Sequence, residues 1–255
     1  MPCTTIQVFS AKILGLCGGL QFPLDVYGSI AARDSVDRRR NIIFSRDRDN
    51  CQTVTEQDPY LVLTGPSRAI VLLDPVIIEV MLKVKGAVEC EDKILNFQAS
   101  ELIWSDTWVS RMMREPYTRK LSTLDLALGS IVSSVEATVF IRVTNVLLPA
   151  VFFVTARTSK NTDSEKILLL DSRHKSQPVA PDGQINLSRS VVSARVTGYL
   201  VICMEEPVEH SNEHKVFVEK HFPANKKALM RLPPIRYGSG AIELTVAWSL
   251  ISRGH

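Results

Sequence analysis

Apolar and polar residues alternate with a period of two along most of the chain. This alternation predicts β-strands, whose successive side chains point to opposite faces of a sheet. The clearest runs are 76–86 and 129–145, where valine, isoleucine and leucine alternate with charged and hydroxyl side chains. Glycine, proline, asparagine and aspartate separate the runs, as turn residues do. Helical spacing of apolar residues is scarce, so the sequence predicts an all-β protein with few or short helices.

Shorter runs with the same alternation predict further strands at 4–14, 24–32, 42–44, 60–63, 69–73, 151–157, 166–170, 191–204, 215–222 and 242–250. In the first run the alternation changes phase at Phe9, which predicts a β-bulge, because one extra residue turns every later side chain to the other face. The alternation is weakest between 91 and 122, where the sequence is compatible with a strand, a helical turn or both. The large apolar residues of that stretch are Trp104, Trp108, Met112 and Met113.

Many short, half-buried strands must cover their apolar faces, and two stacked antiparallel sheets do this. We therefore expect an antiparallel two-sheet β-sandwich, of which the C2-like fold is one form, with a closed barrel as the alternative. Strands and helices do not alternate, which argues against Rossmann and TIM-barrel folds. Residues 1–255 contain no low-complexity linker and no internal repeat, so we expect a single domain.

Composition places the chain among folded globular proteins. Of its 255 residues, 45% are hydrophobic and 22% are charged, and the formal net charge is only +3, so nucleic acid is not an expected partner. No run approaches the roughly 18 apolar residues of a membrane-spanning helix, and the N-terminus lacks the uninterrupted apolar core of a signal peptide. The five cysteines are odd in number and form no CxxC pair. This predicts free thiols in a cytosolic or nuclear setting, of which we expect the cytoplasm, and gives no sign of a metal or a cofactor.

Segment 33–49 has the most prominent run of charge in the chain. It holds six arginines and four aspartates, so six positive charges less four negative leave +2. Arginine clamps anions and acidic protein surfaces through paired hydrogen bonds. This segment, with one arginine outside it, is therefore the expected binding surface for another protein. The candidate residues are Arg33, Asp34, Asp37, Arg38, Arg39, Arg40, Arg46, Arg48 and Arg68.

Two other interpretations of this segment are open. The aspartates at positions 34, 37, 47 and 49 could gather around Ca²⁺ for calcium or lipid binding of the C2 kind, although calcium prefers a site with net negative charge. Alternatively, the arginines and aspartates pair with one another on a solvated surface, as charge runs commonly do. We expect this internal pairing, and no metal site.

Motifs for catalysis are scarce. The glycines at 18–19 and 238–240 lack the following helix and Lys-Ser/Thr of a P-loop, and the sequence contains no HExxH or GxSxG motif. His210 and His214 are four residues apart, but they lie in the polar stretch EEPVEHSNEHK without a third ligand. We expect both side chains to be solvated.

The stretch 131–141, IVSSVEATVFI, resembles the active-site signature of ribosome-inactivating rRNA N-glycosidases. The resemblance implies that Glu136 takes the place of the catalytic glutamate, but Val139 stands where that family has an arginine. The alternating pattern predicts a strand here, in which residues three apart face opposite ways and Glu136 points outward. We therefore expect a non-enzymatic protein, with N-glycosidase activity as the alternative.

Five stretches carry a resemblance to a second family: FPLDVYGSIAARDSVDRRRNIIFSRDRDNCQ, DPYLVLTGPSRAIVLLDPVIIEVMLKVKG, KLSTLDL, SVEATVFIRV and ELTVAWSL. They are similar to a plant family, abundant in grasses, that is described as a domain of unknown function (DUF6598). The resemblance implies a cytosolic single-domain protein, and similar domains occur beside ribosome-inactivating modules in stress-related plant proteins. The expected function is an interaction module related to stress or defence, with another protein as its partner.

Overall fold

The computed structural model describes residues 2–103, 109–158, 165–174, 178–208 and 213–251. Within these residues the chain forms seventeen β-strands, three short 3-10 helices and no α-helix, so the predicted all-β class is confirmed. The 3-10 helices are η1 (Arg48–Asn50), η2 (Glu89–Glu91) and η3 (Ser172–His174). In this part of the chain, none of the helices has the length and apolarity that a membrane span requires.

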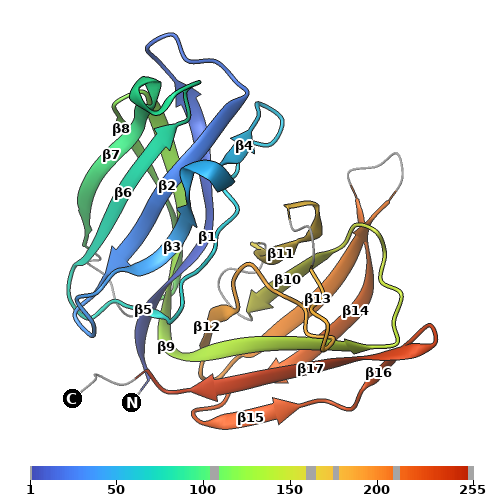
Figure 1. The fold of residues 1–255 in the computed structure, drawn as a ribbon. Coiled ribbons are helices and arrows are strands. Elements are labelled where there is room, and N and C mark those ends of the chain that lie inside the picture. Colours follow the sequence, from blue (N-terminus) through green and yellow to red (C-terminus); the bar gives the residue numbers. More distant parts are fainter. Residues whose placement is uncertain (1, 104–108, 159–164, 175–177, 209–212, 252–255) are drawn as a thin grey trace.

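The strands form three antiparallel sheets (Figure 1). The eight-stranded sheet contains β1 (Cys3–Leu16), β5 (Ile70–Val71), β8 (Arg111–Arg119), β9 (Ser122–Thr144), β12 (Val191–Arg195), β15 (Ala228–Arg231), β16 (Ile235–Tyr237) and β17 (Gly240–Ser249). The five-stranded sheet contains β2 (Leu24–Arg33), β3 (Asn41–Arg46), β4 (Gln52–Val54), β6 (Val76–Val84) and β7 (Lys93–Leu102). The four-stranded sheet contains β10 (Phe153–Thr158), β11 (Ile167–Asp171), β13 (Tyr199–Pro207) and β14 (His214–Pro223).

The hydrogen-bonded order of the strands defines each sheet. The main path of the largest sheet is β15-β17-β9-β1-β5, and β8, β12 and β16 pair with members of this path. The other two sheets run β3-β2-β6-β7, with β4 on β2, and β11-β10-β13-β14. Each sheet is open among the described residues. The fold is therefore sandwich-like, with three sheets where the sequence predicted two.

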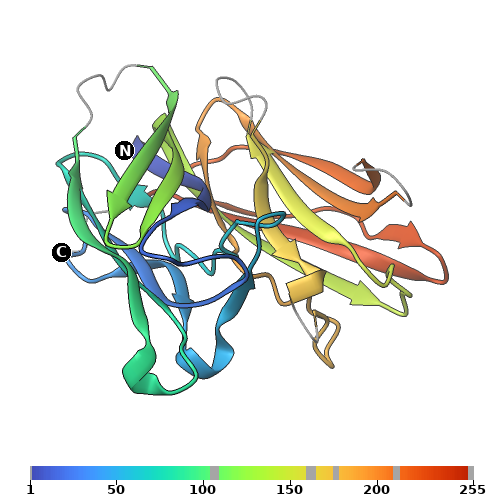
Figure 2. The same ribbon diagram turned by 90° about the horizontal axis from the view of Figure 1, so that it is seen from above.

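Two hydrophobic cores hold these layers together. In one, β1 and the first half of β9 pack against the five-stranded sheet; in the other, the second half of β9, with β12 and β17, packs against the four-stranded sheet. Figures 1 and 2 show the result as two lobes. We call β1–β8 with the first half of β9 the N-terminal lobe, and the second half of β9 with β10–β17 the C-terminal lobe.

Strand β9 links the lobes by changing partners along its length. It pairs with β1 as far as Ser134 and with β17 from Glu136 onward. Ser133, between these two stretches, has a left-handed φ of 48°, and the register with β1 shifts at this point. The same strand thus contributes to both cores. That residues 1–255 form one domain stays a prediction.

The strongest sequence patterns correspond to strands. β6 buries every second residue from Val76 to Val84. The bulge predicted at Phe9 is confirmed, because the pairing of β1 with β9 shifts register between Val8 and Ser10. The strand predicted at 129–145 is the second half of the longer β9. These features follow from local alternation alone.

Other predictions were wrong or incomplete. Residues 60–63 form an isolated bridge rather than a strand: Tyr60 pairs with Lys12 of β1, and the N–H of Leu61 donates to the Ala11 carbonyl. The side chain of Gln52 also donates to the Tyr60 carbonyl and accepts the N–H of Val62. The predicted strand 191–204 is two strands, β12 and β13, separated by a turn closed by the N–H of Gly198 and the Arg195 carbonyl. The weakly patterned stretch contains β7 and β8, and β8 carries Met112 and Met113. Trp104 and Trp108 lie outside the described residues.

Candidate functional site

The loop between β2 and β3 is held by the carboxylate of Asp34, a residue that is 5% exposed. This carboxylate accepts the backbone N–H groups of Val36, Asp37 and Val71 at 3.1, 3.2 and 2.8 Å. The Arg68 guanidinium adds a bidentate ion pair, with Nη1 and Nη2 2.6 and 2.9 Å from the two oxygens. Burial on its own raises the pKa of Asp34, but the hydrogen bonds, that of Arg68 foremost, bring the pKa below its usual value. The loop backbone is therefore fixed.

Two further arginines tie this loop to the sheet. Nε of Arg33 and Nε of Arg40 each lie 2.6 Å from a different oxygen of Glu79 on β6. Arg33 also donates from Nη1 to the backbone carbonyl of Arg38. Burial raises the pKa of Glu79, and the hydrogen bonds of the two arginines outweigh this and lower it. One carboxylate thus fixes both flanks of the loop.

The remaining arginines of the loop, Arg38 and Arg39, have exposed side chains. Their main-chain groups are engaged, since the Arg39 N–H donates to the Asp37 carboxylate at 2.9 Å. Within the described residues, neither guanidinium makes a hydrogen bond or an ion pair. The loop therefore holds two positive charges in solvent on a fixed backbone.

Arg46 and Arg48 form a second group. Arg48 pairs with Asp92 at 2.9 Å and donates to the Gly86 carbonyl at 3.0 Å. Arg46 pairs in register with Gly28 of β2, and its buried Nε has no hydrogen-bond partner in the part of the chain that the structure describes. Because Gly28 is five residues from the end of β2, this group lies about 16 Å along the strand from the loop. The nine candidate residues thus do not form one continuous cluster.

The expectation that arginines and aspartates of segment 33–49 pair with one another is wrong. The described side-chain ion pairs of its arginines go to Glu79 and Asp92, and Asp34 is paired with Arg68, all three partners lying outside the segment. Strand register decides this, because it places β6 and the residues before β7 beside β2. The aspartates do not converge either: among the described residues, no group of three His, Cys, Asp or Glu side chains is arranged to hold a metal ion.

An apolar surface lies next to the loop. Met81 and Phe97 pair across β6 and β7, and they are 38% and 51% exposed. They line a shallow depression of about 230 Å³ that Arg40 and Glu79 also border. Exposed large apolar side chains beside charged ones are typical of protein-binding surfaces.

Glu136 faces away from the C-terminal core, as the sequence predicted, but its side chain is not free in solvent. It is half-buried, and its carboxylate accepts the N–H of Ala69 at 2.7 Å and the hydroxyl of Ser249 at 3.3 Å. Val139 is 1% exposed and packs in the C-terminal core, because residues three apart on β9 face opposite ways. The electrostatic partner in the N-glycosidase signature therefore has no counterpart at Val139.

His214 is exposed, as the sequence predicted, but it begins β14 rather than lying in a loop, and its ring has partners. Its ring stacks on Phe153 with 4.5 Å between centroids, and its Nδ1 lies 3.4 Å from the buried Glu205 carboxylate. His210 lies outside the described residues.

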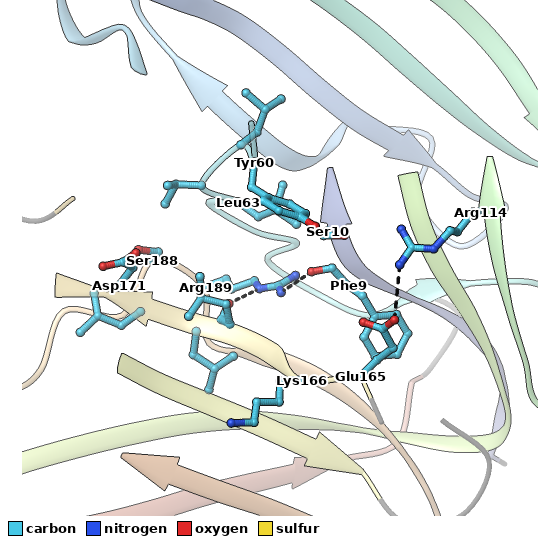
Figure 3. Close-up of a pocket in the computed structure, with 15 residues that line it drawn as sticks. Phe9, Ser10, Tyr60, Leu63, Arg114, Glu165, Lys166, Asp171, Ser188 and Arg189 are labelled. Atoms are coloured by element: carbon cyan, nitrogen blue, oxygen red, sulfur yellow. Dashed lines mark hydrogen bonds and ion pairs between the residues drawn. The ribbon is translucent and has the colours of Figure 1, made fainter. Parts of the chain in front are cut away.

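A pocket of about 240 Å³ lies between the two lobes (Figure 3). Its lining comes from the bulge in β1, the stretch 60–63, β8, β11 and the residues just before β12. Figure 3 shows the Arg189 guanidinium in the middle of this lining, close to Phe9. The pocket leaves no signal in the sequence, because its walls are far apart along the chain and Arg189 lies outside any run of charged residues.

Comparisons with known proteins give one family and a weak structural likeness. A family model described as "Domain of unknown function (DUF6598)" matches residues 5–232, and no curated protein matches the sequence. Among solved structures, human GIVD cytosolic phospholipase A2 matches with a TM-score of 0.28 and 9% identity, over 97% of this chain and 32% of that chain. The same human protein in complex with methyl gamma-linolenyl fluorophosphonate matches with a TM-score of 0.28 and 8% identity, over 98% and 32%. The chain spans about a third of their length.

Proposed function

We propose that this chain, which belongs to the DUF6598 family, is a non-enzymatic interaction module that binds an acidic segment of another protein through its β2–β3 loop. One observation carries the proposal: Arg38 and Arg39 extend from a fixed loop, and neither guanidinium forms an ion pair within the described residues. Exposed guanidinium groups attract carboxylates over several ångströms and form paired hydrogen bonds with them.

Fixing the loop in advance favours binding. The Asp34 network and the shared Glu79 carboxylate already hold the backbone, so a partner does not have to order it. Association otherwise loses free energy whenever a flexible loop becomes ordered at an interface. The loop therefore presents its charges at a low entropic cost.

The adjoining apolar surface indicates what else the partner carries. An aromatic or aliphatic side chain next to the acidic residues would cover Met81 and Phe97 while the carboxylates meet Arg38 and Arg39. Covering two half-exposed side chains contributes on the order of 1 kcal/mol each. The proposed partner segment is therefore acidic with one large apolar residue.

Fluorescence anisotropy with a labelled FDEDEE peptide tests the proposal. The double substitution Arg38→Ala with Arg39→Ala removes two charges without disturbing a described side-chain contact. At about 0.2–1 kcal/mol for each exposed ion pair, we expect affinity to fall roughly 2- to 30-fold. We also expect the wild-type affinity to fall as salt is added, because salt screens exposed charges.

The matched control is Lys226→Ala with Lys227→Ala, which removes the same charge from exposed positions of the C-terminal lobe. This variant should bind as the wild type does, and the uncharged peptide FNQNQQ should bind more weakly than FDEDEE. Equal losses in both double variants would contradict the proposal. So would tighter binding of a single-stranded oligonucleotide than of the peptide.

The proposal includes a cytoplasmic location for the protein and a role in plant stress or defence. The five cysteines are free thiols, which supports a reducing compartment such as the cytoplasm. Plant origin and a role in stress or defence are supported by the resemblance of the sequence motifs. A single-domain organisation is supported by β9, which contributes to both cores.

A further inference from the structure

The side chain of Arg189 links the two lobes by hydrogen bonds at the bulge of β1. Its Nε donates to the Leu168 carbonyl at 2.7 Å, its Nη1 to the Val8 carbonyl at 2.6 Å and its Nη2 to the Phe9 carbonyl at 2.9 Å. Successive carbonyls of a regular strand point in opposite directions, but the bulge lets those of Val8 and Phe9 meet the same side chain. Arg189 thus satisfies polar groups that the bulge removes from the ladder.

These hydrogen bonds satisfy three N–H groups of the guanidinium but do not neutralise its positive charge. Arg189 is 3% exposed, and within the described residues its hydrogen bonds go to carbonyl groups and to no carboxylate. A guanidinium has five N–H donors, so one N–H on Nη1 and one on Nη2 stay without a partner in this part of the chain. Burial lowers the pKa of Arg189 to about 9, as expected for a cation with no opposite charge.

The other charged side chains around the pocket do not supply the missing negative charge. Each has an opposite charge in contact: Arg114 lies 3.0 Å from Asp125 and 3.5 Å from Glu165, Lys166 lies 2.8 Å from Glu205, and Asp171 lies 2.6 Å from Arg173. Among the described residues of this lining, Arg189 is therefore the charged side chain that no opposite charge contacts. A buried unpaired charge costs several kcal/mol, and an anion brought into the pocket would offset that cost.

The rest of the lining suits an apolar body. Its apolar members include Phe9, Leu61, Leu63, Leu168 and Leu170. At about 240 Å³ the pocket is smaller than the roughly 300–1,000 Å³ that drug-sized ligands occupy. The ligand must therefore be small, with one anionic group and an otherwise apolar surface.

We propose that the pocket between the lobes binds a small carboxylic acid with an aromatic or branched aliphatic body. Its carboxylate accepts the two remaining N–H groups of Arg189, and its apolar part lies against the leucine side chains. Hydrogen bonds between a guanidinium and a carboxylate are charge-assisted and are stronger than those between neutral groups. The site is separate from the β2–β3 loop, so either proposal can fail while the other holds.

Calorimetric titration of the full chain with 3-phenylpropionate, against its neutral isostere 3-phenylpropanamide, tests the charge requirement without any variant. We expect the acid to bind at least about tenfold more tightly than the amide, since only the acid supplies two acceptors and a negative charge. Nuclear Overhauser contacts should join the phenyl ring to methyl groups of Leu63 and Leu168. Equal affinities, no binding of the acid at millimolar concentration, or contacts to methyl groups elsewhere would overturn the proposal.

A pocket-filling variant tests the location independently. Ser10 lines the pocket, is half-buried, and makes no side-chain hydrogen bond among the described residues. Ser10→Phe should therefore leave the contacts of Arg189 in place and weaken 3-phenylpropionate at least tenfold. If a folded Ser10→Phe variant binds the acid as the wild type does, the pocket is not its site. If this variant does not fold, the wild-type comparison of acid and amide decides.

Discussion

Asp34→Asn is the substitution that most directly tests how the β2–β3 loop is held. Asparagine keeps the size and shape of the side chain but removes its charge and replaces one oxygen with an NH₂ group. That group would face the Arg68 guanidinium or the N–H of Val71, which are themselves donors. The variant therefore loses the ion pair and brings donors together.

The expected loss follows from the contacts removed. A hydrogen bond to a charged group contributes about 1.5–3 kcal/mol, and removing one partner of a buried ion pair costs about 3–5 kcal/mol. The Asp34 side chain is 1% exposed, but that of Arg68 is 26% exposed, so water can resolvate part of the freed guanidinium. We expect the free energy of unfolding to fall by about 2–4 kcal/mol at pH 7.

Urea unfolding followed by circular dichroism measures this loss, and Asp37→Asn is the matched control. Asp37 is exposed, and the described hydrogen bond of its side chain goes to the N–H of Arg39, so its substitution should cost less than about 1 kcal/mol. The pKa of Asp34 is lowered in the fold, so its stabilisation is present above the unfolded-state pKa near 3.9 and is lost as the pH falls through the folded-state pKa. The gap between wild type and Asp34→Asn should therefore narrow in acid. Equal losses from the two substitutions, or a gap that is undiminished in acid, would refute this account of the loop.

Three further predictions concern other parts of the chain. Burial and the Asp92 carboxylate raise the pKa of Tyr27 to about 12, so Asp92→Asn should bring the pKa of Tyr27 closer to its usual value. Ultraviolet titration of the phenol at alkaline pH measures this pKa, and an unchanged titration would exclude the hydrogen bond between Tyr27 and Asp92. Arg189→Met removes the guanidinium from the Leu168, Val8 and Phe9 carbonyls, of which that of Val8 keeps the Gln7 Nε2 donor. It should lower the free energy of unfolding by about 3–5 kcal/mol in urea, whereas a loss below about 1 kcal/mol would show that the bulge does not need the guanidinium. In an assay of adenine release from ribosomes, wild type should match Glu136→Ala, since Val139 offers no cation; release above that control would establish N-glycosidase activity.

The sequence predicted the features that depend on neighbouring residues. Period-two patterns predicted β6, the second half of β9 and the bulge at Phe9, because successive side chains of a strand point to opposite faces. It did not predict which carboxylates meet the arginines. Glu79 lies beside Arg33 and Arg40 because β2 and β6 pair in a register that places Ala31 opposite Glu79. Such a register is set by packing of whole sheets, which a charge count within one segment does not contain.

The bulge at Phe9 was predicted from neighbouring residues, but its hydrogen-bond donor was not. A predicted bulge at Phe9 already implies carbonyls outside the ladder, and buried carbonyls require donors. The sequence does not say which donor, because Arg189 is 180 residues away from Phe9. A neutral amide could donate to two of these carbonyls at a smaller desolvation cost than a guanidinium. The cation brings two surplus N–H groups and an unbalanced charge into a pocket whose other charges are matched, and this surplus distinguishes a ligand site from a structural crosslink.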